Sequence, residues 1–139
     1  MLAVTPLRRL TGWQAIGPFR RRIGLAAFAY VAAHFSLWAG VDNGLDFAGI
    51  GEDIAKRPYL TVGFAAFVLL VPLAVTSTRA SMHRLGKRWI ALHRLVYVAA
   101  VLAVVHYWWL VKKGLRGPIV HAVVLGALLG VRPLARRAR

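Results

Sequence analysis

Four apolar stretches, separated by short polar segments, dominate the pattern of hydrophobic and polar positions along this chain. The first three contain 17 to 23 residues. At about 1.5 Å of rise per residue, stretches of this length reach across most or all of a bilayer core of about 30 Å. The fourth stretch has only 14 residues. The predicted spans cover residues 23–41, 59–75, 89–111 and 118–131. The pattern therefore predicts an all-α integral membrane protein, a helical bundle of about four spans forming a single domain over residues 1–139.

Polar segments connect the predicted spans. Residues 42–58 hold all four acidic residues and several glycines, which favours a loop with a short helical turn. Residues 76–88 form a polar, basic connector, and residues 112–117 a short one. Pro72 is expected to kink the exit of the second span.

The basic residues indicate how the spans are oriented. If the spans alternate in direction, 13 Lys and Arg residues fall with the two termini and the 76–88 connector, and five fall on the other side. By the positive-inside rule both termini are then cytoplasmic, in a protein that contacts lipid along its spans. Spans 23–41 and 89–111 would run parallel. A weak internal repeat agrees, because IGLAAFAYVAA and IALHRLVYVAA match at six of eleven positions.

Composition excludes several classes of function. With 59% hydrophobic residues and a mean hydropathy of +0.61, the chain is too apolar for an ordinary soluble domain. Its formal charge of +15 would suggest nucleic acid in a soluble protein, but the basic residues cluster between apolar runs, so no nucleic-acid partner is expected. The absence of cysteine excludes iron-sulfur clusters and covalent c-type haem. No motif typical of hydrolysis occurs.

Three histidines lie within the apolar spans and are the candidate functional residues: His34, His93 and His106. Their expected depths from the basic boundary are about 18, 8 and 27 Å. By depth alone His34 can meet either of the other two. Imidazoles on two parallel helices, facing across an apolar gap, are what bis-histidine ligation of a b-type haem requires. The alternative is that these histidines hydrogen-bond between helices.

The positions of His93 and His106 around their helix, and two further histidines, also bear on the possible ligands. His93 and His106 are 13 residues apart, which leaves them about 140° apart around an ideal helix. His83, in the basic connector, is expected to be solvated. His121 is either a spare ligand or an interfacial hydrogen-bonding residue.

Four segments resemble, in order and spacing, the MsrQ (formerly YedZ) family of the ferric reductase-like transmembrane superfamily. They are RRRIGLAAFAYVAAH, KRPYLTVG, PLAVTST and LGKRWIALHRLVYVAAVLAVVHY. The resemblance implies a b-type haem subunit that passes electrons from the quinone pool, or from a flavin reductase with FMN, to MsrP. That partner is a periplasmic molybdenum enzyme that reduces methionine sulfoxide in proteins. One or two haems are implied, with His34, His93 and His106 as ligands, and with His34 and His106 holding the outer haem.

The chain departs from this family in two respects. Family members usually have six spans, and this sequence resembles a form that lacks the first two helices. The wider superfamily also carries a second histidine about 14 residues before His34, where this chain has Arg20. His93 therefore has no evident partner. We expect Arg20 to lie near a haem propionate or a flavin phosphate, because a guanidinium suits an anion.

Two other functions are compatible with the sequence. One is a cytochrome that serves another acceptor, such as ferric iron, although the chain has no flavin and nicotinamide domain. Another is a non-redox membrane scaffold or assembly protein, in which the histidines are packing residues.

Overall fold

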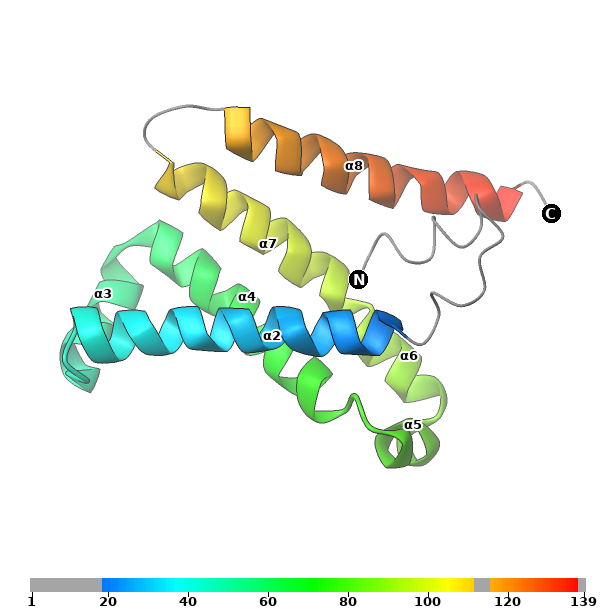
Figure 1. The fold of residues 1–139 in the computed structure, drawn as a ribbon, viewed down its shortest axis with the longest axis horizontal. Helices are drawn as coiled ribbons and strands as arrows, with labels where there is room; N and C mark the ends of the chain where they lie inside the picture. The colour runs from blue at the N-terminus through cyan, green and yellow to red at the C-terminus, as the bar shows by residue number, and fades with distance from the viewer. Residues whose placement is uncertain (1–18, 112–115, 138–139) are drawn as a thin grey trace.

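A computed structural model describes residues 19–111 and 116–137, and the described chain is helical apart from short turns (Figure 1). Three helical segments are long and apolar enough to cross a membrane, and a shorter apolar stretch, Gly117–Gly130, lies in the last helix. The elements are α2 (Phe19–Leu37), the π-helix η2 (Trp38–Asp42), α3 (Phe47–Lys56), α4 (Pro58–Val75), α5 (Arg79–Leu85), α6 (Lys87–His93), α7 (Leu95–Leu110) and α8 (Arg116–Arg137). The predicted all-α bundle is confirmed.

The long helices alternate in direction along the chain, so that α2 and α7 run the same way (Figure 1). The parallel arrangement predicted for the first and third spans is therefore present. The most extensive interface joins α4 to α7, and the buried side chains there include Ala66, Leu73, Val96 and Ala99. Small residues allow helix backbones to approach closely, which is how membrane helices gain packing energy without help from water.

Aromatic side chains attach α2 to α4. The Phe35 ring stacks on Phe67 with centroids 5.0 Å apart, and Phe28 stacks on the same ring at 6.1 Å. Phe64 lies 5.7 Å from Phe35. Most other large apolar side chains of α2 are exposed, and Tyr30 is 80% exposed. Such a surface suits contact with lipid.

The segment between the first two spans is more ordered than predicted. Where the sequence favoured a loop with a short turn, the structure has the ten-residue helix α3. The Asp46 carboxylate caps it by accepting a hydrogen bond from the Ala48 amide at 3.2 Å. Before it, Gly44 and Leu45 adopt positive φ angles of 56° and 61°, which reverse the chain after η2.

The predicted third span is confirmed as the membrane-length helical segment Lys87–Leu110, but a tight turn at Arg94 interrupts its regular α-helix. Helix α6 ends at His93 and α7 begins at Leu95. Around Arg94 the backbone bonds span three residues, from Arg94 N to the Ala91 carbonyl and from Tyr97 N to the Arg94 carbonyl. These tighter bonds are typical of 3₁₀ turns. The connector before α6 also contains a helix, α5, which the sequence analysis did not predict.

Helix α4 continues through Pro72 to Val75. Beyond that point the hydroxyls of Thr76 and Ser77 donate to the carbonyls of Pro72 and Leu73, each at 2.6 Å. Side-chain donors thereby satisfy carbonyls that the helix end leaves free.

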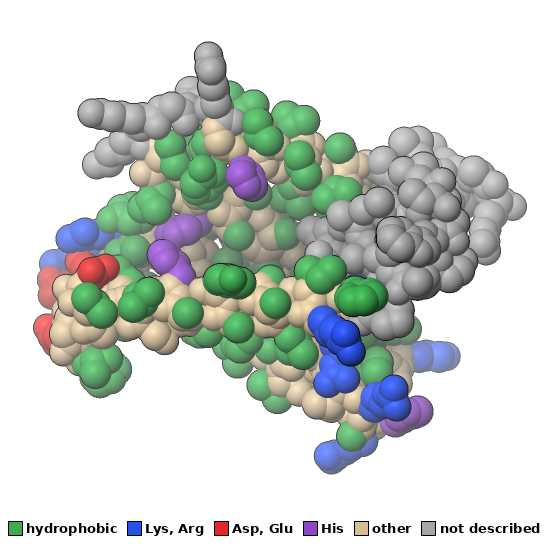
Figure 2. Space-filling model, viewed as in Figure 1, with side chains coloured by type: hydrophobic (Ala, Val, Ile, Leu, Met, Phe, Trp, Pro, Cys, Tyr) green, Lys and Arg blue, Asp and Glu red, His purple; other side chains and the backbone are tan. Residues whose placement is uncertain are grey.

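Charges are segregated between the two ends of the bundle. Figure 2 shows the acidic side chains confined to the end that carries α3, and most of the visible basic side chains at the end that carries α5. Histidine side chains gather around a hollow above α2, toward the acidic end (Figure 2).

We expect Thr61→Val to loosen α3. The Thr61 hydroxyl donates to the carbonyl of Ile54, in α3, and lies 3.3 Å from that of Arg57. Losing such a bond costs about 1 kcal/mol, so amide hydrogen exchange in α3 should accelerate about fivefold. The control is Thr78→Val, which removes the cap of α5 and should accelerate exchange there only. Unchanged exchange in α3 would contradict this role.

Candidate functional site

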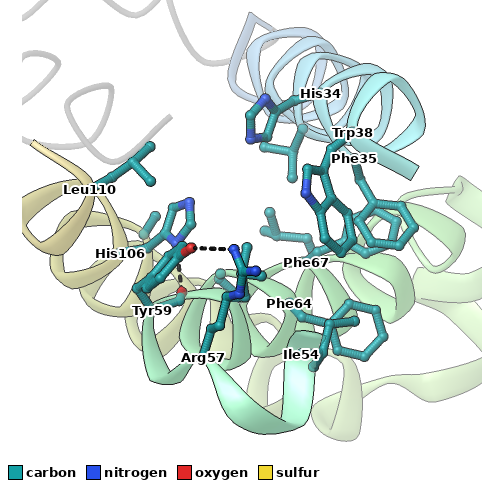
Figure 3. A pocket seen from close by; sticks show the side chains of 16 residues that line it. His34, Phe35, Trp38, Ile54, Arg57, Tyr59, Phe64, Phe67, His106 and Leu110 are labelled. Carbon is teal, nitrogen blue, oxygen red and sulfur yellow. Dashed lines mark hydrogen bonds between the residues drawn. The ribbon is translucent and has the colours of Figure 1, made fainter. Parts of the chain in front are cut away.

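A cavity of about 350 Å³ lies between α2, α4 and α7, at the end of the bundle that carries α3 (Figure 3). This volume is within the range of small-molecule and cofactor sites. Its walls are mainly aromatic and aliphatic, with a few polar groups. The lining residues are Val31, His34, Phe35, Trp38, Ile54, Arg57, Tyr59, Leu60, Gly63, Phe64, Ala66, Phe67, Leu70, Ala103, His106 and Leu110.

The ring of His106 is held in one orientation by α4. Its Nδ1 lies 2.7 Å from the Tyr59 carbonyl oxygen. A carbonyl only accepts hydrogen bonds, so Nδ1 carries the proton and donates it. The other nitrogen, Nε2, then keeps its lone pair, and Figure 3 shows the ring extending toward the gap. A neutral imidazole fixed in this way is a typical metal ligand.

Gly63 makes this position of the ring possible. A Cβ atom at residue 63 would lie 2.6 Å from Nδ1 and 2.7 Å from Cε1 of His106. Real Cβ atoms essentially never approach other atoms so closely, so the imidazole ring would have to shift. The glycine therefore gives the imidazole room against the first turns of α4.

His34 faces His106 from the opposite wall of the cavity. It lies in the last turn of α2, and Figure 3 shows its ring reaching toward the gap that separates the two histidines. The structure therefore brings together the two residues that the sequence analysis paired for the outer haem. Phe35 and Trp38, the next cavity-lining residues of the chain, form an adjacent aromatic wall.

This pair of imidazoles is suited to a metal that brings other ligands with it. In the part of the chain that the structure describes, no group of three or more His, Asp or Glu residues could hold a bare ion. Two imidazoles supply only two ligands. A haem would bring nitrogen ligands of its own, and His34 and His106 would hold its iron. The residues present thus fit a haem.

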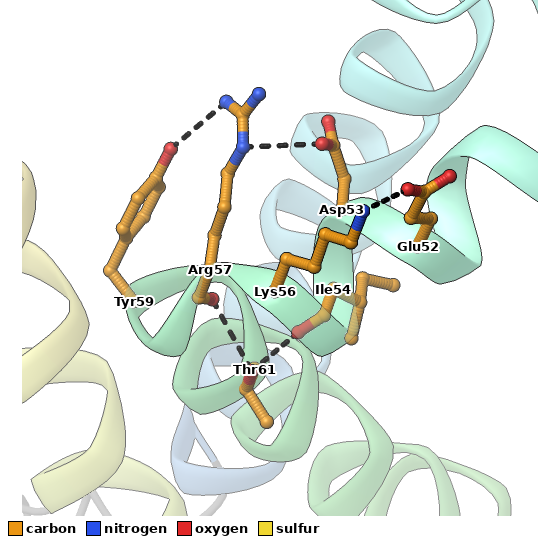
Figure 4. A network of polar contacts seen from close by, with 7 residues as sticks. All are labelled: Glu52, Asp53, Ile54, Lys56, Arg57, Tyr59 and Thr61. Atoms are coloured by element: carbon orange, nitrogen blue, oxygen red, sulfur yellow. Dashed lines mark hydrogen bonds and ion pairs between the residues drawn. The ribbon is translucent and has the colours of Figure 1, made fainter.

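A polar network forms the rim of the cavity where α3 meets α4 (Figure 4). Arg57 is its centre: Nε lies 3.1 Å from an Asp53 carboxylate oxygen, and one terminal nitrogen lies 3.4 Å from the Tyr59 hydroxyl. These two neighbours, Tyr59 first and Asp53 second, raise the pKa of Arg57 above its usual value. Its charge is therefore permanent. Lys56 pairs with Glu52 beside it.

The sequence analysis did not identify Arg57, Tyr59 or Gly63 as site residues. All three lie in the segment KRPYLTVG, one of the four segments that carry the family resemblance. Tyr59 and Gly63 contribute to the site because α7 approaches the start of α4 and brings His106 against them. Neither the spacing of residues along the sequence nor the composition predicts that contact.

His93 lies apart from this cavity and does not line it. It is buried, at 8% exposed, and its ring stacks on Trp89 with centroids 3.9 Å apart. Nδ1 contacts the Trp89 carbonyl at 3.1 Å, and the buried Nε2 has no hydrogen-bond partner among the described residues. Trp89 is itself held by a bond from its indole nitrogen to the Thr76 carbonyl, at 2.9 Å.

The remaining predicted residues also lie outside the cavity. Arg20 is exposed in the first turn of α2, 14 residues and about 20 Å along the helix from His34. His83 is exposed in α5, which confirms the expected solvation. His121 contacts the Gly117 carbonyl of its own helix at 2.8 Å and meets the Tyr107 ring edge-on.

Comparison with known proteins shows which family this chain resembles. Residues 1–104 match the family model described as ferric reductase like transmembrane component. The chain is 54% identical over 134 residues to the protein-methionine-sulfoxide reductase heme-binding subunit MsrQ of Ralstonia nicotianae, which covers 94% of this chain and 62% of that protein. It is 55% identical to the protein of that name from Rhodospirillum rubrum, over 99% of this chain and 68% of the relative. No solved structure matches.

The fold, the cavity and the family match define the class: a multi-pass, ferric reductase-like transmembrane protein. At 54 and 55% identity over nearly the whole chain, the chain belongs to the MsrQ family. It spans about two thirds of the length of these relatives.

We expect Gly63→Ala to release the His106 ring from α4. In protein free of bound cofactor, ¹⁵N NMR of the native ring should report one tautomer, protonated at Nδ1. In the variant the added methyl displaces the ring and both tautomers should appear. Gly51→Ala is the matched control, because a Cβ there meets nothing within 4 Å. A single unchanged tautomer in Gly63→Ala would show that the close approach does not fix the ring.

Proposed function

We propose that this chain is a b-type haem electron-transfer subunit of a protein-methionine sulfoxide reductase system. His34 and His106 would hold one haem in the cavity between α2, α4 and α7. The observation that carries the proposal is the pair of facing imidazoles in an apolar cavity, with the Nε2 of His106 left free by the bond to Tyr59. The name of its relatives, heme-binding subunit, supports the same interpretation.

Haem supplies reversible one-electron transfer when it is bound. The chain's own residues set the conditions for it. The hydrogen bond from His106 to the Tyr59 carbonyl fixes the tautomer and the orientation of the ring. Phe35, Phe64 and Phe67 contribute to an apolar wall that limits access of water to the metal site.

The electrons pass from a donor in or below the membrane to an acceptor outside it. We place the chain in the bacterial inner membrane with both termini cytoplasmic, because most basic residues fall on that side. The cavity then lies toward the periplasm, since Ile54 of α3 and Arg57 line it. This position suits delivery to an MsrP-like periplasmic molybdenum enzyme. The donor is the quinone pool or a flavin reductase that carries FMN.

His93 is the ligand of a second haem nearer the cytoplasmic end. Its buried Nε2, without a partner among the described residues, supports this assignment, because an unsatisfied polar atom in the interior is costly.

We expect His106→Ala and His34→Ala each to abolish the bis-imidazole visible spectrum of detergent-purified protein, oxidised and dithionite-reduced. His121→Ala is the matched control: it removes a membrane-helix histidine outside the cavity and should leave the spectrum intact. If a second haem is held at His93, a residual Soret band should remain in both variants. A colourless wild type expressed with ample haem, or equal loss in His121→Ala, would contradict the proposal.

Arg20 is proposed to bind an anionic group, a haem propionate near His93 or a flavin phosphate. It lies too far along α2 to serve the cavity at His34. Arg20→Ala should therefore slow reduction of the protein or lower the cofactor content at the cytoplasmic end, while the signal of the His34–His106 haem is retained. Arg21→Ala is a neighbouring control. Unchanged reduction rate and cofactor content in Arg20→Ala would refute this role.

A further inference from the structure

Among the described residues that line the cavity, Arg57 is the only Lys or Arg, and it stands at the rim where α3 gives way to α4. Figure 3 shows its side chain reaching from this corner toward the gap between His34 and His106. The rest of the lining close to it is apolar or aromatic, including Ile54, Trp38 and Leu60.

Two nitrogens of the Arg57 guanidinium are bonded within the described residues, and its remaining N–H donors are not. Nε is engaged by Asp53 and one terminal nitrogen by the Tyr59 hydroxyl. The 3.4 Å separation from that hydroxyl makes the second contact a weak one. The other terminal nitrogen makes no hydrogen bond within the described residues, and guanidinium carries five N–H donors in all. Arg57 therefore has donors left for an additional anion.

The backbone of this corner is also fixed. Thr61 bonds the carbonyls of Ile54 and Arg57, which ties the end of α3 to the first turn of α4 (Figure 4). The same turn supplies the Tyr59 carbonyl that orients His106. One short segment, residues 57–61, thus positions both the imidazole and the cation.

Because the cavity is apolar and Arg57 lies at its rim, a ligand with a charged edge can bind favourably in only one orientation. A carboxylate is costly inside an apolar wall unless it meets a cation and hydrogen-bond donors. The deep lining, with Ala66, Phe67 and Leu70, offers neither. A planar ligand with carboxylates on one edge would therefore enter with that edge toward Arg57.

We propose that Arg57, assisted by the Tyr59 hydroxyl, binds a carboxylate of the macrocycle held between His34 and His106, and so fixes which edge of the ring faces the periplasmic end. This inference rests on the proposed function. Arg57 acts here as a binding and positioning residue through its charge and its planar fork, which matches carboxylate geometry.

The test compares Arg57→Gln with Lys56→Gln in the chain of 139 residues. Both variants remove a cation paired with an acid four residues earlier, but only Arg57 lines the cavity. The rate of haem loss to excess apomyoglobin is measured for each protein, loaded with protohaem or with its dimethyl ester, which lacks free carboxylates. Retention of the bis-imidazole spectrum at the start confirms that each variant is folded and loaded.

We expect Arg57→Gln to lose protohaem about 10-fold faster or more than the wild type, the range of a charge-assisted hydrogen bond, and Lys56→Gln to match the wild type. The dimethyl ester should leave all three proteins at similar rates. Arg57→Lys should be intermediate, and the midpoint potential should fall in Arg57→Gln only, because a nearby cation favours the added electron.

Three outcomes would overturn the inference. Equal rates for Arg57→Gln and Lys56→Gln would show that Arg57 has no special contact. Faster loss of both protohaem and its dimethyl ester from Arg57→Gln would indicate a structural role instead. A wild type that binds no haem would refute the proposed function, and with it this inference, whereas a haem-loaded wild type with an unaffected Arg57→Gln refutes the inference alone.

Discussion

The close approach of α7 to the first turns of α4 is the contact on which the cavity depends. It places the ring of His106 against Gly63 and within hydrogen-bond distance of the Tyr59 carbonyl. The packing that permits it is made by small buried residues, Ala66 in α4 and Ala99 in α7. The packing of α4 against α7 therefore also sets the orientation of the His106 ring. A change in the distance between these helices would alter both.

Several polar side chains of the described residues are hydrogen-bonded over short stretches of chain. His93 and His121 contact the carbonyls four residues earlier in their own helices, and Thr76 and Ser77 do the same. Such bonds suit a membrane, where no water is available to replace a missing partner. The contact from His106 to Tyr59 differs, because it joins residues 47 positions apart. It is tertiary structure, and it occurs at the candidate site.

The sequence predicted the elements that depend on composition and length, and missed those that depend on contact. The apolar stretches located the spans, and charge and a weak repeat indicated that the first and third are parallel. Helix α3 was missed because its glycines and acids resemble a loop, although Asp46 is a good N-cap. The break at Arg94 was missed because one charged residue in an apolar run carries no signal of its own for a 3₁₀ turn.

The site shows the same division. His34 and His106 were identifiable as imidazoles in apolar helices, and their pairing followed from the family resemblance, since depth alone also allowed His93. The roles of Gly63 and Arg57 could not be derived, because a glycine in a membrane helix and a basic residue before Pro58 each have many ordinary explanations. Only the placement of α7 and of the α3–α4 corner distinguishes them.

The π-helix at the end of α2 has a consequence for variation in chain length. Each of its turns holds about one residue more than an α-turn, as the bond from Asn43 N to the Trp38 carbonyl shows. A homologue could lose one residue between Trp38 and Asp42 and convert this turn to α-helix, with His34 and Phe35 still facing the cavity. A deletion within the preceding helix would instead rotate His34 by about 100° relative to everything before the deletion. Insertions and deletions are therefore expected to collect on the C-terminal side of His34.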